Sequence, residues 1–175
     1  TKWSNRLPEI LKGKYNENEY RKSQLYRKAN YRFDIFSSSF SFIIILCMLI
    51  FSGFSLIDNW SAIISSNYIL MALSFFAIIG LGSELLMTPF SIYDTFVIEE
   101  RFGFNKTTVK TYISDKIKNL LLTAILGGVI LTVIMVIWSK TGDFFWLLAW
   151  AVVTLLSIFM SMFYSILIVP LFNKQ

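Results

Sequence analysis

Charged residues are missing from four long stretches of this chain, and these stretches limit the folds that it can adopt. The charge-free runs contain 23, 25, 21 and 30 residues and lie between Asp34 and Asp58, Asp58 and Glu84, Lys118 and Lys140, and Asp143 and Lys174. A helix that crosses a bilayer needs about 20 apolar residues. Soluble folds seldom carry four such runs, which argues against buried core helices. The sequence therefore predicts an all-α, polytopic transmembrane helical bundle.

Four membrane helices are expected in the region 36–175, at residues 36–57, 67–88, 118–139 and 144–170. The basic segment 1–35 precedes them, and we expect it to form an amphipathic surface helix or, alternatively, to serve only as a topology anchor. The first part of the connection 89–117, from 89 to 105, holds eight large apolar side chains among its charges. We therefore expect it to be a structured, helical connection that extends the second helix, turns at Gly103 and packs back on the protein.

Lysine and arginine are distributed unevenly around the expected helices. Nine lie in residues 1–34, and five lie in the connection between the second and third helices. The positive-inside rule places both of these segments, together with the C-terminus, on the cytoplasmic side. The basic residues behind the net charge of +5 thus flank the expected membrane helices. The bilayer, and not nucleic acid, is therefore the expected partner. The Lys-, Asn- and Ile-rich composition indicates a bacterial source, and hence a multi-pass protein of the bacterial inner (cytoplasmic) membrane.

Polar residues inside the apolar stretches are candidates for a functional surface. Glu84 lies about one helical turn before Pro89, and an acid at membrane depth is a functional hypothesis by default. Its alternative is an interfacial carboxylate that reaches water or pairs with a lysine. A serine stripe on the fourth helix, which would face the bundle interior or water, consists of Ser157, Ser161 and Ser165. Alternatively, these hydroxyl groups bond to the carbonyls of their own helix.

The chain shows no complete catalytic site. It contains no histidine, and no H-E-x-x-H, C-x-x-C, phosphate-loop or G-x-S-x-G motif occurs in it. Glu99 and Glu100 are neighbours, so on a helix their side chains point about 100° apart and do not form a catalytic pair. We expect one of them to pair with Arg101 or with a basic residue of the N-terminal segment, and the other to face water.

Three stretches together resemble one known family. The sequence PFSIYDTFVIEERFGFN, at 89–105, closely resembles the signature of the membrane-embedded CAAX prenyl endopeptidases, a family of zinc metalloproteases. LPEILKGKYNENEYRKSQLYRKANYRF, at 7–33, is similar to the segment before that family's second membrane helix, and IVPLFNK, at 168–174, is similar to the end of its fifth. The resemblance covers about residues 7–174, and the central motif is highly specific.

The resemblance implies a seven-helix membrane protein around a water-filled chamber, with zinc held by an H-E-x-x-H helix and a later glutamate. Such proteins cleave prenylated CAAX peptides in eukaryotes, and bacterial relatives act in membrane-protein quality control. By this comparison the chain begins after the family's first helix and stops before its catalytic domain. We therefore expect zinc in the intact protein, no cofactor in this chain, and no activity from this chain alone. Its expected partners are the bilayer, a C-terminal catalytic domain of the same protein, and a peptide or protein substrate.

The resemblance also selects residues, none of them catalytic or metal-binding. We expect a structural or supporting role beside the active site for the motif residues Pro89, Tyr93, Phe96, Glu99, Glu100, Gly103, Phe104 and Asn105. We expect Glu84, Ser157, Ser161 and Ser165 to line the chamber. Two other functions stay open: a stand-alone membrane scaffold or quality-control module without protease activity, and a small transporter. The transporter would require an internal repeat, which the four unlike apolar runs do not show.

Overall fold

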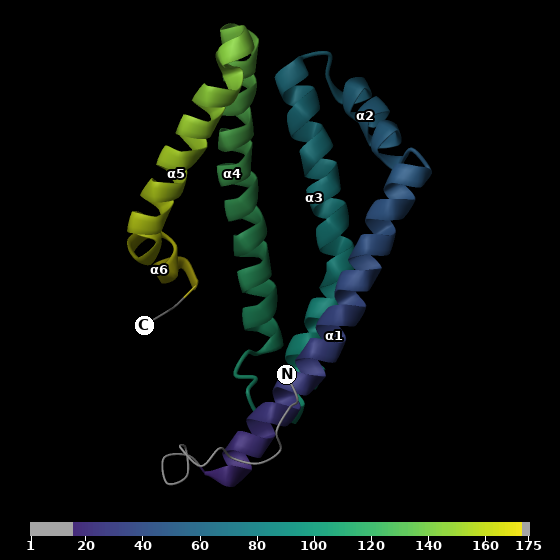
Figure 1. Cartoon of the computed structure of the whole chain (residues 1–175), viewed down its shortest axis with the longest axis vertical. Coiled ribbons are helices and arrows are strands. Elements are labelled where there is room, and N and C mark those ends of the chain that lie inside the picture. The colour runs from purple at the N-terminus through teal and green to yellow at the C-terminus, as the bar shows by residue number, and fades with distance from the viewer. Residues whose placement is uncertain (1–15, 173–175) are drawn as a thin grey trace. The chain divides into compact units, whose positions relative to one another are not determined.

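The computed structural model describes residues 16–172, and within this range every regular element is a helix (Figure 1). This confirms the all-α prediction. The elements in chain order are α1 (Glu17–Ile50), α2 (Gly53–Ile64), α3 (Tyr68–Tyr93), the π-helix η2 (Asp94–Glu99), α4 (Val109–Thr141), the 3₁₀-helix η3 (Gly142–Phe144), α5 (Phe145–Leu167) and α6 (Val169–Phe172).

Three uninterrupted helical stretches of the described chain are long and apolar enough to cross a membrane: Glu17–Ile50, Tyr68–Glu99 and Val109–Tyr164. The third contains both α4 and α5, which η3 joins. The expected membrane helices therefore correspond to α1, α3, α4 and α5. None of the apolar windows in these stretches is buried within the described chain, so their side chains are available to lipid or to other helices.

The bounds of the first helix differ from those expected. We expected a surface helix within residues 1–35 and a separate span at 36–57, whereas α1 continues without a break from Glu17 to Ile50. The switch from charged to apolar residues changes the surroundings of the helix, but no glycine or proline interrupts its backbone. Asn16 caps its start by accepting a hydrogen bond from the Asn18 amide at 3.0 Å. Residues 1–15 of the expected N-terminal segment lie outside the described residues.

The end of the first charge-free run forms a helix of its own. Ser52 has a positive φ of 54°, which ends α1, and α2 follows from Gly53. With 12 residues, or about 18 Å at 1.5 Å per residue, α2 is too short to cross a bilayer. The apolar residues that we expected to complete the first span therefore form a separate short helix.

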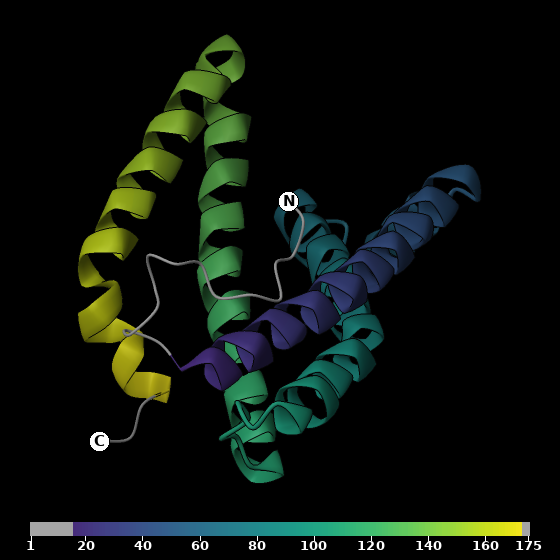
Figure 2. The same ribbon diagram turned by 60° about the horizontal axis from the view of Figure 1, so that its bottom comes forward.

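The chain divides into two compact units. One contains α1 and the residues after it up to Leu56, together with Gly80–Thr107, which are the second half of α3, η2 and the turn that follows. In this unit α1 runs beside the end of α3, as both views show (Figures 1 and 2). The other contains Ile57–Ile79 together with α4, α5 and α6. The motif that resembles the protease family thus belongs to the same unit as α1.

The second unit contains a hairpin of α4 and α5 closed by η3 (Figure 1). Gly142 begins the turn with φ 51° and ψ −125°, a conformation that side chains disfavour. The rings of Trp138 and Phe145 meet edge to face across it, 4.9 Å apart. On α4, a Cβ atom added to Gly128 would lie 4.0 Å from Leu73 Cδ2, so this small residue faces α3.

Replacing Gly142 by alanine will destabilise the hairpin, because the new Cβ forces a strained backbone at about 1–3 kcal/mol. The expected loss in thermal midpoint is about 2–12 °C in detergent. Gly127→Ala is the matched control, since that glycine lies within α4 with open space beside it. An unchanged midpoint for Gly142→Ala would show that the turn relaxes without cost.

Candidate functional site

The family-like motif forms an ordered turn at the end of η2. Gly103 adopts a left-handed φ of 65°, and its amide donates to the Glu100 carbonyl at 2.9 Å. The Phe104 amide donates to the Glu99 carbonyl at 2.9 Å. These two bonds are those of a Schellman motif, the helix ending in which a glycine adopts the left-handed conformation. In this motif the amides after the helix donate to carbonyls of its last turn that would otherwise lack a partner. The glycine of the motif is therefore required by the backbone of this turn.

Two irregular features precede the turn. Pro89 lies inside α3, where its ring removes one backbone hydrogen bond, and the backbone then widens into the π-helix Asp94–Glu99. A π-helix inserts an extra residue and so changes the face on which the following side chains lie; such segments often mark functional sites. Within it, Ile98 is only 7% exposed and Phe96 is half-buried. The membrane helix and the turn are thus one continuous, locally distorted element.

The two adjacent carboxylates of the motif have different partners. Glu99 Oε1 accepts a hydrogen bond from the Tyr26 hydroxyl of α1 at 3.5 Å, whereas Glu100 Oε2 accepts one from Asn105 Nδ2 at 3.0 Å. Asn105 Oδ1 in turn accepts from the Thr107 amide at 2.7 Å, which fixes the exit of the turn. As expected from their positions on the helix, the two acids do not converge on one point.

The partner of Glu99 differs from the cation that we expected. Arg101 follows two residues later, and side chains at i and i+2 of a helix do not face each other. Its guanidinium lies instead 6.0 Å from the centre of the Phe102 ring. The hydroxyl group that reaches Glu99 comes from Tyr26, 73 residues earlier in the chain. Glu99 is therefore hydrogen-bonded to α1 by a neutral donor.

Aromatic rings hold the turn against α1. The Tyr26 ring lies 4.7 Å from the Phe104 ring and 5.6 Å from the Phe102 ring, distances at which aromatic pairs attract. Lys22, one helical turn earlier, places its ammonium group 5.5 Å from the centre of the Phe104 ring. A Cβ atom on Gly103 would lie 3.3 Å from this ammonium group, the flexible end of the lysine side chain, so the left-handed φ, and not a lack of space, is what favours glycine at the turn.

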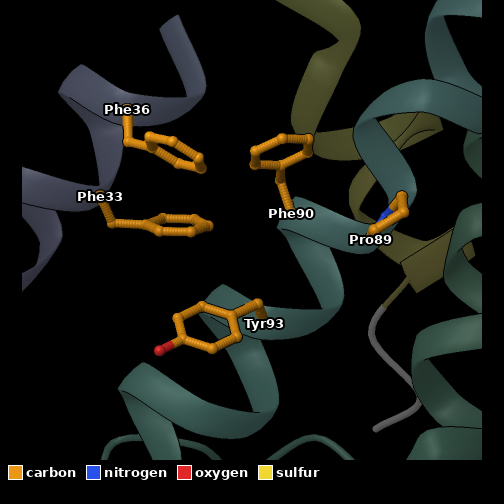
Figure 3. A pocket seen from close by; sticks show the side chains of 5 residues that line it. All are labelled: Phe33, Phe36, Pro89, Phe90 and Tyr93. Carbon is orange, nitrogen blue, oxygen red and sulfur yellow. The ribbon is translucent and has the colours of Figure 1, made fainter. Parts of the chain in front are cut away.

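A second aromatic group lies further along α1, toward the apolar part of the helix. Phe33 stacks on Tyr93 with ring centres 5.2 Å apart, and Phe90 lies 6.0 Å from Phe36 and 4.9 Å from Phe40. Figure 3 shows the rings of Phe33 and Phe36 pointing from α1 toward Phe90. We call the contacts of α1 with both groups of rings the aromatic clasp, made by Tyr26, Phe33, Phe36, Phe40, Phe90, Tyr93, Phe102 and Phe104.

The α1 half of the aromatic clasp was not among the predicted site residues. Its four rings, at positions 26, 33, 36 and 40, are spaced by seven, three and four residues, which places them along one side of a helix. That spacing was available in the sequence. It was missed because the segment was divided at residue 35 into a surface helix and a membrane helix.

The candidate chamber residues lie on two different helices. Glu84 is a half-buried residue of α3, and its backbone carbonyl accepts the Thr88 hydroxyl at 2.6 Å. Ser157 and Ser161 lie on α5 and line one hollow of about 520 Å³ together with Thr154. Ser165 lies on the same helix, but its side chain lies outside the described part of the structure.

The residues that the structure describes form no zinc site. It has no histidine, and the residues that the structure describes contain no group of three or more His, Cys, Asp or Glu side chains that could hold a metal ion. Structural and catalytic zinc sites need at least three such protein ligands. The side chains gathered at the turn are instead aromatic rings, two separated carboxylates, one amide and basic groups.

Replacing Tyr26 separates the contribution of the rings from that of the hydrogen bond. Tyr26→Phe keeps both ring contacts and loses a long hydrogen bond, so it should cost at most about 0.5 kcal/mol. Tyr26→Ala also loses the packing and should cost about 2 kcal/mol, or about 4–8 °C in thermal midpoint. Equal losses in the two variants would mean that the hydroxyl, and not the ring, holds the turn.

Comparison with known proteins agrees with this architecture. The family model described as the CAAX prenyl protease N-terminal region, with five membrane helices, matches residues 1–174. A crystal structure of Ste24p from S. mikatae superposes with a TM-score of 0.85 at 32% sequence identity. The superposition covers 97% of this chain and 41% of that one.

Curated relatives carry the same description. The CAAX prenyl protease 1 homolog of Arabidopsis thaliana is 45% identical over 108 residues, which are 62% of this chain and 26% of the relative. The probable CAAX prenyl protease 1 of Schizosaccharomyces pombe is 31% identical over 180 residues, or 95% of this chain and 38% of the relative. The chain thus spans well under half of the length of these relatives. It belongs to the CAAX prenyl protease family, of which it forms the N-terminal membrane domain.

Proposed function

We propose that this chain is the membrane domain of a zinc metalloendopeptidase, and that its Glu99–Asn105 turn braces the catalytic part of the intact protein. The observation that carries the proposal is the turn itself. Its backbone is fixed by a Schellman ending and its rings by α1, while Glu100 remains exposed and hydrogen-bonded to Asn105. A rigid turn with an oriented carboxylate and amide on its surface is suited to docking another part of the protein.

The length of the relatives supports a role for this chain within a larger enzyme. It spans 26–41% of the relatives and of the solved structure described above, and the relatives' names describe prenyl proteases. We propose that zinc, whose chemistry would polarise a peptide carbonyl and activate water, is bound outside this chain. Within the enzyme, this chain would hold the turn, present membrane helices and help to enclose the substrate, a peptide or protein whose C-terminus carries the prenyl group.

The proposal also assigns the remaining polar residues. Glu84 on α3 and the serines of α5, Ser157, Ser161 and Ser165, would face the water-filled chamber of the intact protein. The hollow along Ser157 and Ser161 supports this assignment for α5. The charged N-terminal part of α1 and the Glu99–Asn105 turn would lie on the cytoplasmic side, as the positive-inside rule predicts. Location in a bacterial inner membrane remains a prediction from composition.

Asn105→Ala tests the brace in the intact protein. It removes both the hydrogen bond to Glu100 and the acceptor of the Thr107 amide, so the turn should lose its fixed exit. We expect cleavage of a farnesylated CAAX peptide to slow by roughly 10- to 100-fold at full zinc content, because a small displacement of an active site has effects of this size. Glu99→Ala should act in the same direction but more weakly, because the bond that it removes, from the Tyr26 hydroxyl at 3.5 Å, is long.

Lys106→Ala is the matched control, because Lys106 is the exposed neighbour of Asn105 and should leave turnover unchanged. Zinc content and thermal midpoint are measured for each variant, so that a failure to fold is distinguished from a misplaced active site. Normal protein levels and normal turnover in both Asn105→Ala and Glu99→Ala would refute the brace. Absence of zinc from the active wild-type protein would refute the assignment of the enzyme class.

A further inference from the structure

A groove with two chemically different ends lies between α1 and the α3–η2 element. Two hollows of about 360 and about 320 Å³ share Phe33, Phe36 and Tyr93 in their linings, so they adjoin each other along α1, and we refer to the two together as the groove. The first hollow also contains Pro89 and Phe90, and Figure 3 shows its rings. The second adds Arg32 of α1 and Arg101, which follows η2. One end of the groove is therefore aromatic, and the other carries two guanidinium groups.

The groove lies where α1 passes from its charged to its apolar part. Asp34 is the last charge before the 23-residue charge-free run; Arg32 precedes it, and Phe36 follows it. The arginine end thus lies on the charged side of this boundary, and the aromatic end lies on the apolar side. Neither Asp34 nor Asp94 lines the groove, so the side chains at its charged end are cationic. This sequence of environments is that of a membrane interface, where lipid phosphates lie above acyl chains.

The rings of the groove are not covered by the described chain. Phe36 is 63% exposed and Tyr93 is 49% exposed, although both take part in the aromatic clasp. Large exposed rings beside two cationic side chains are suited to a ligand that is apolar at one end and anionic at the other. Arginine is suited to the anionic end, because its planar fork of donors matches two phosphate oxygens.

We propose that this groove binds one anionic phospholipid, with its phosphate between Arg32 and Arg101 and an acyl chain against Phe33, Phe36 and Phe90. Basic pockets between membrane helices on the cytoplasmic side commonly bind anionic lipid headgroups. The bound lipid would cover the exposed rings and join α1 to the element that carries the Glu99–Asn105 turn. The inference does not depend on the proposed enzyme activity, because it concerns only side chains of this unit.

Native mass spectrometry of the intact protein, exchanged into mixed micelles with equal phosphatidylglycerol and phosphatidylcholine, tests the proposal. The wild-type protein should retain phosphatidylglycerol in preference to phosphatidylcholine. Loss of each arginine should weaken retention by about fivefold. In the double variant Arg32→Gln, Arg101→Gln, the retained phosphatidylglycerol should therefore fall to the level of phosphatidylcholine. Phe36→Trp, which keeps both arginines but fills the aromatic end, should also reduce retention.

The matched control is Arg21→Gln with Lys28→Gln, which removes two charges from exposed positions of α1 outside the groove. This control should keep the wild-type preference, and thermal midpoints verify that every variant is folded. Equal retention of the two lipids by the wild-type protein would overturn the proposal, since the groove would then not select an anionic headgroup. Equal losses in the control and the arginine variant would overturn it as well. So would release of the lipid by a farnesylated peptide, because the groove would then belong to the substrate.

Discussion

The aromatic contacts between α1 and the end of α3 are the interaction on which this part of the molecule depends. The segment that leads into the Glu99–Asn105 turn contains Pro89 inside α3 and the π-helix Asp94–Glu99, and both interrupt the regular α-helical hydrogen bonding that would fix its direction. Rings of α1 hold this segment in place at two levels along the helix. Tyr26 contacts Phe104 near the turn, and Phe33 contacts Tyr93 nearer the membrane. Because α1 is one unbroken helix, both levels are held by the same rigid element.

This arrangement connects the membrane to the motif. The apolar part of α1 is embedded by its hydropathy, and its charged part carries Lys22 and Tyr26 to Phe104. A displacement of α1 in the bilayer would therefore move the rings that hold the turn. The groove includes Phe33 and Tyr93 of the contacts nearer the membrane and, at its arginine end, Phe102 of the contacts near the turn, so a lipid bound there would touch both groups of rings.

Sequence reasoning was most successful where a single physical signal dominated. Charge-free runs predicted the membrane helices, and a turn was predicted at Gly103, where the structure has a left-handed φ of 65°. It failed where the outcome depended on contacts between distant segments. Nothing near Glu99 in the sequence indicates that its partner is Tyr26, and nothing near Asp94 distinguishes a π-helix from an α-helix. The division of α1 at residue 35 was wrong because a change in solvent does not break a helix.

A double-mutant cycle on Tyr26→Leu and Phe104→Leu in the intact protein tests the central claim most directly. Thermal midpoint and peptide cleavage are measured for the wild-type protein, both single variants and the double variant. If α1 holds the turn through this ring pair, the two substitutions will be coupled by about 1 kcal/mol, and cleavage in the double variant will be no worse than in either single variant. Strictly additive losses in both measurements would contradict the claim, because the two rings would then act independently of each other.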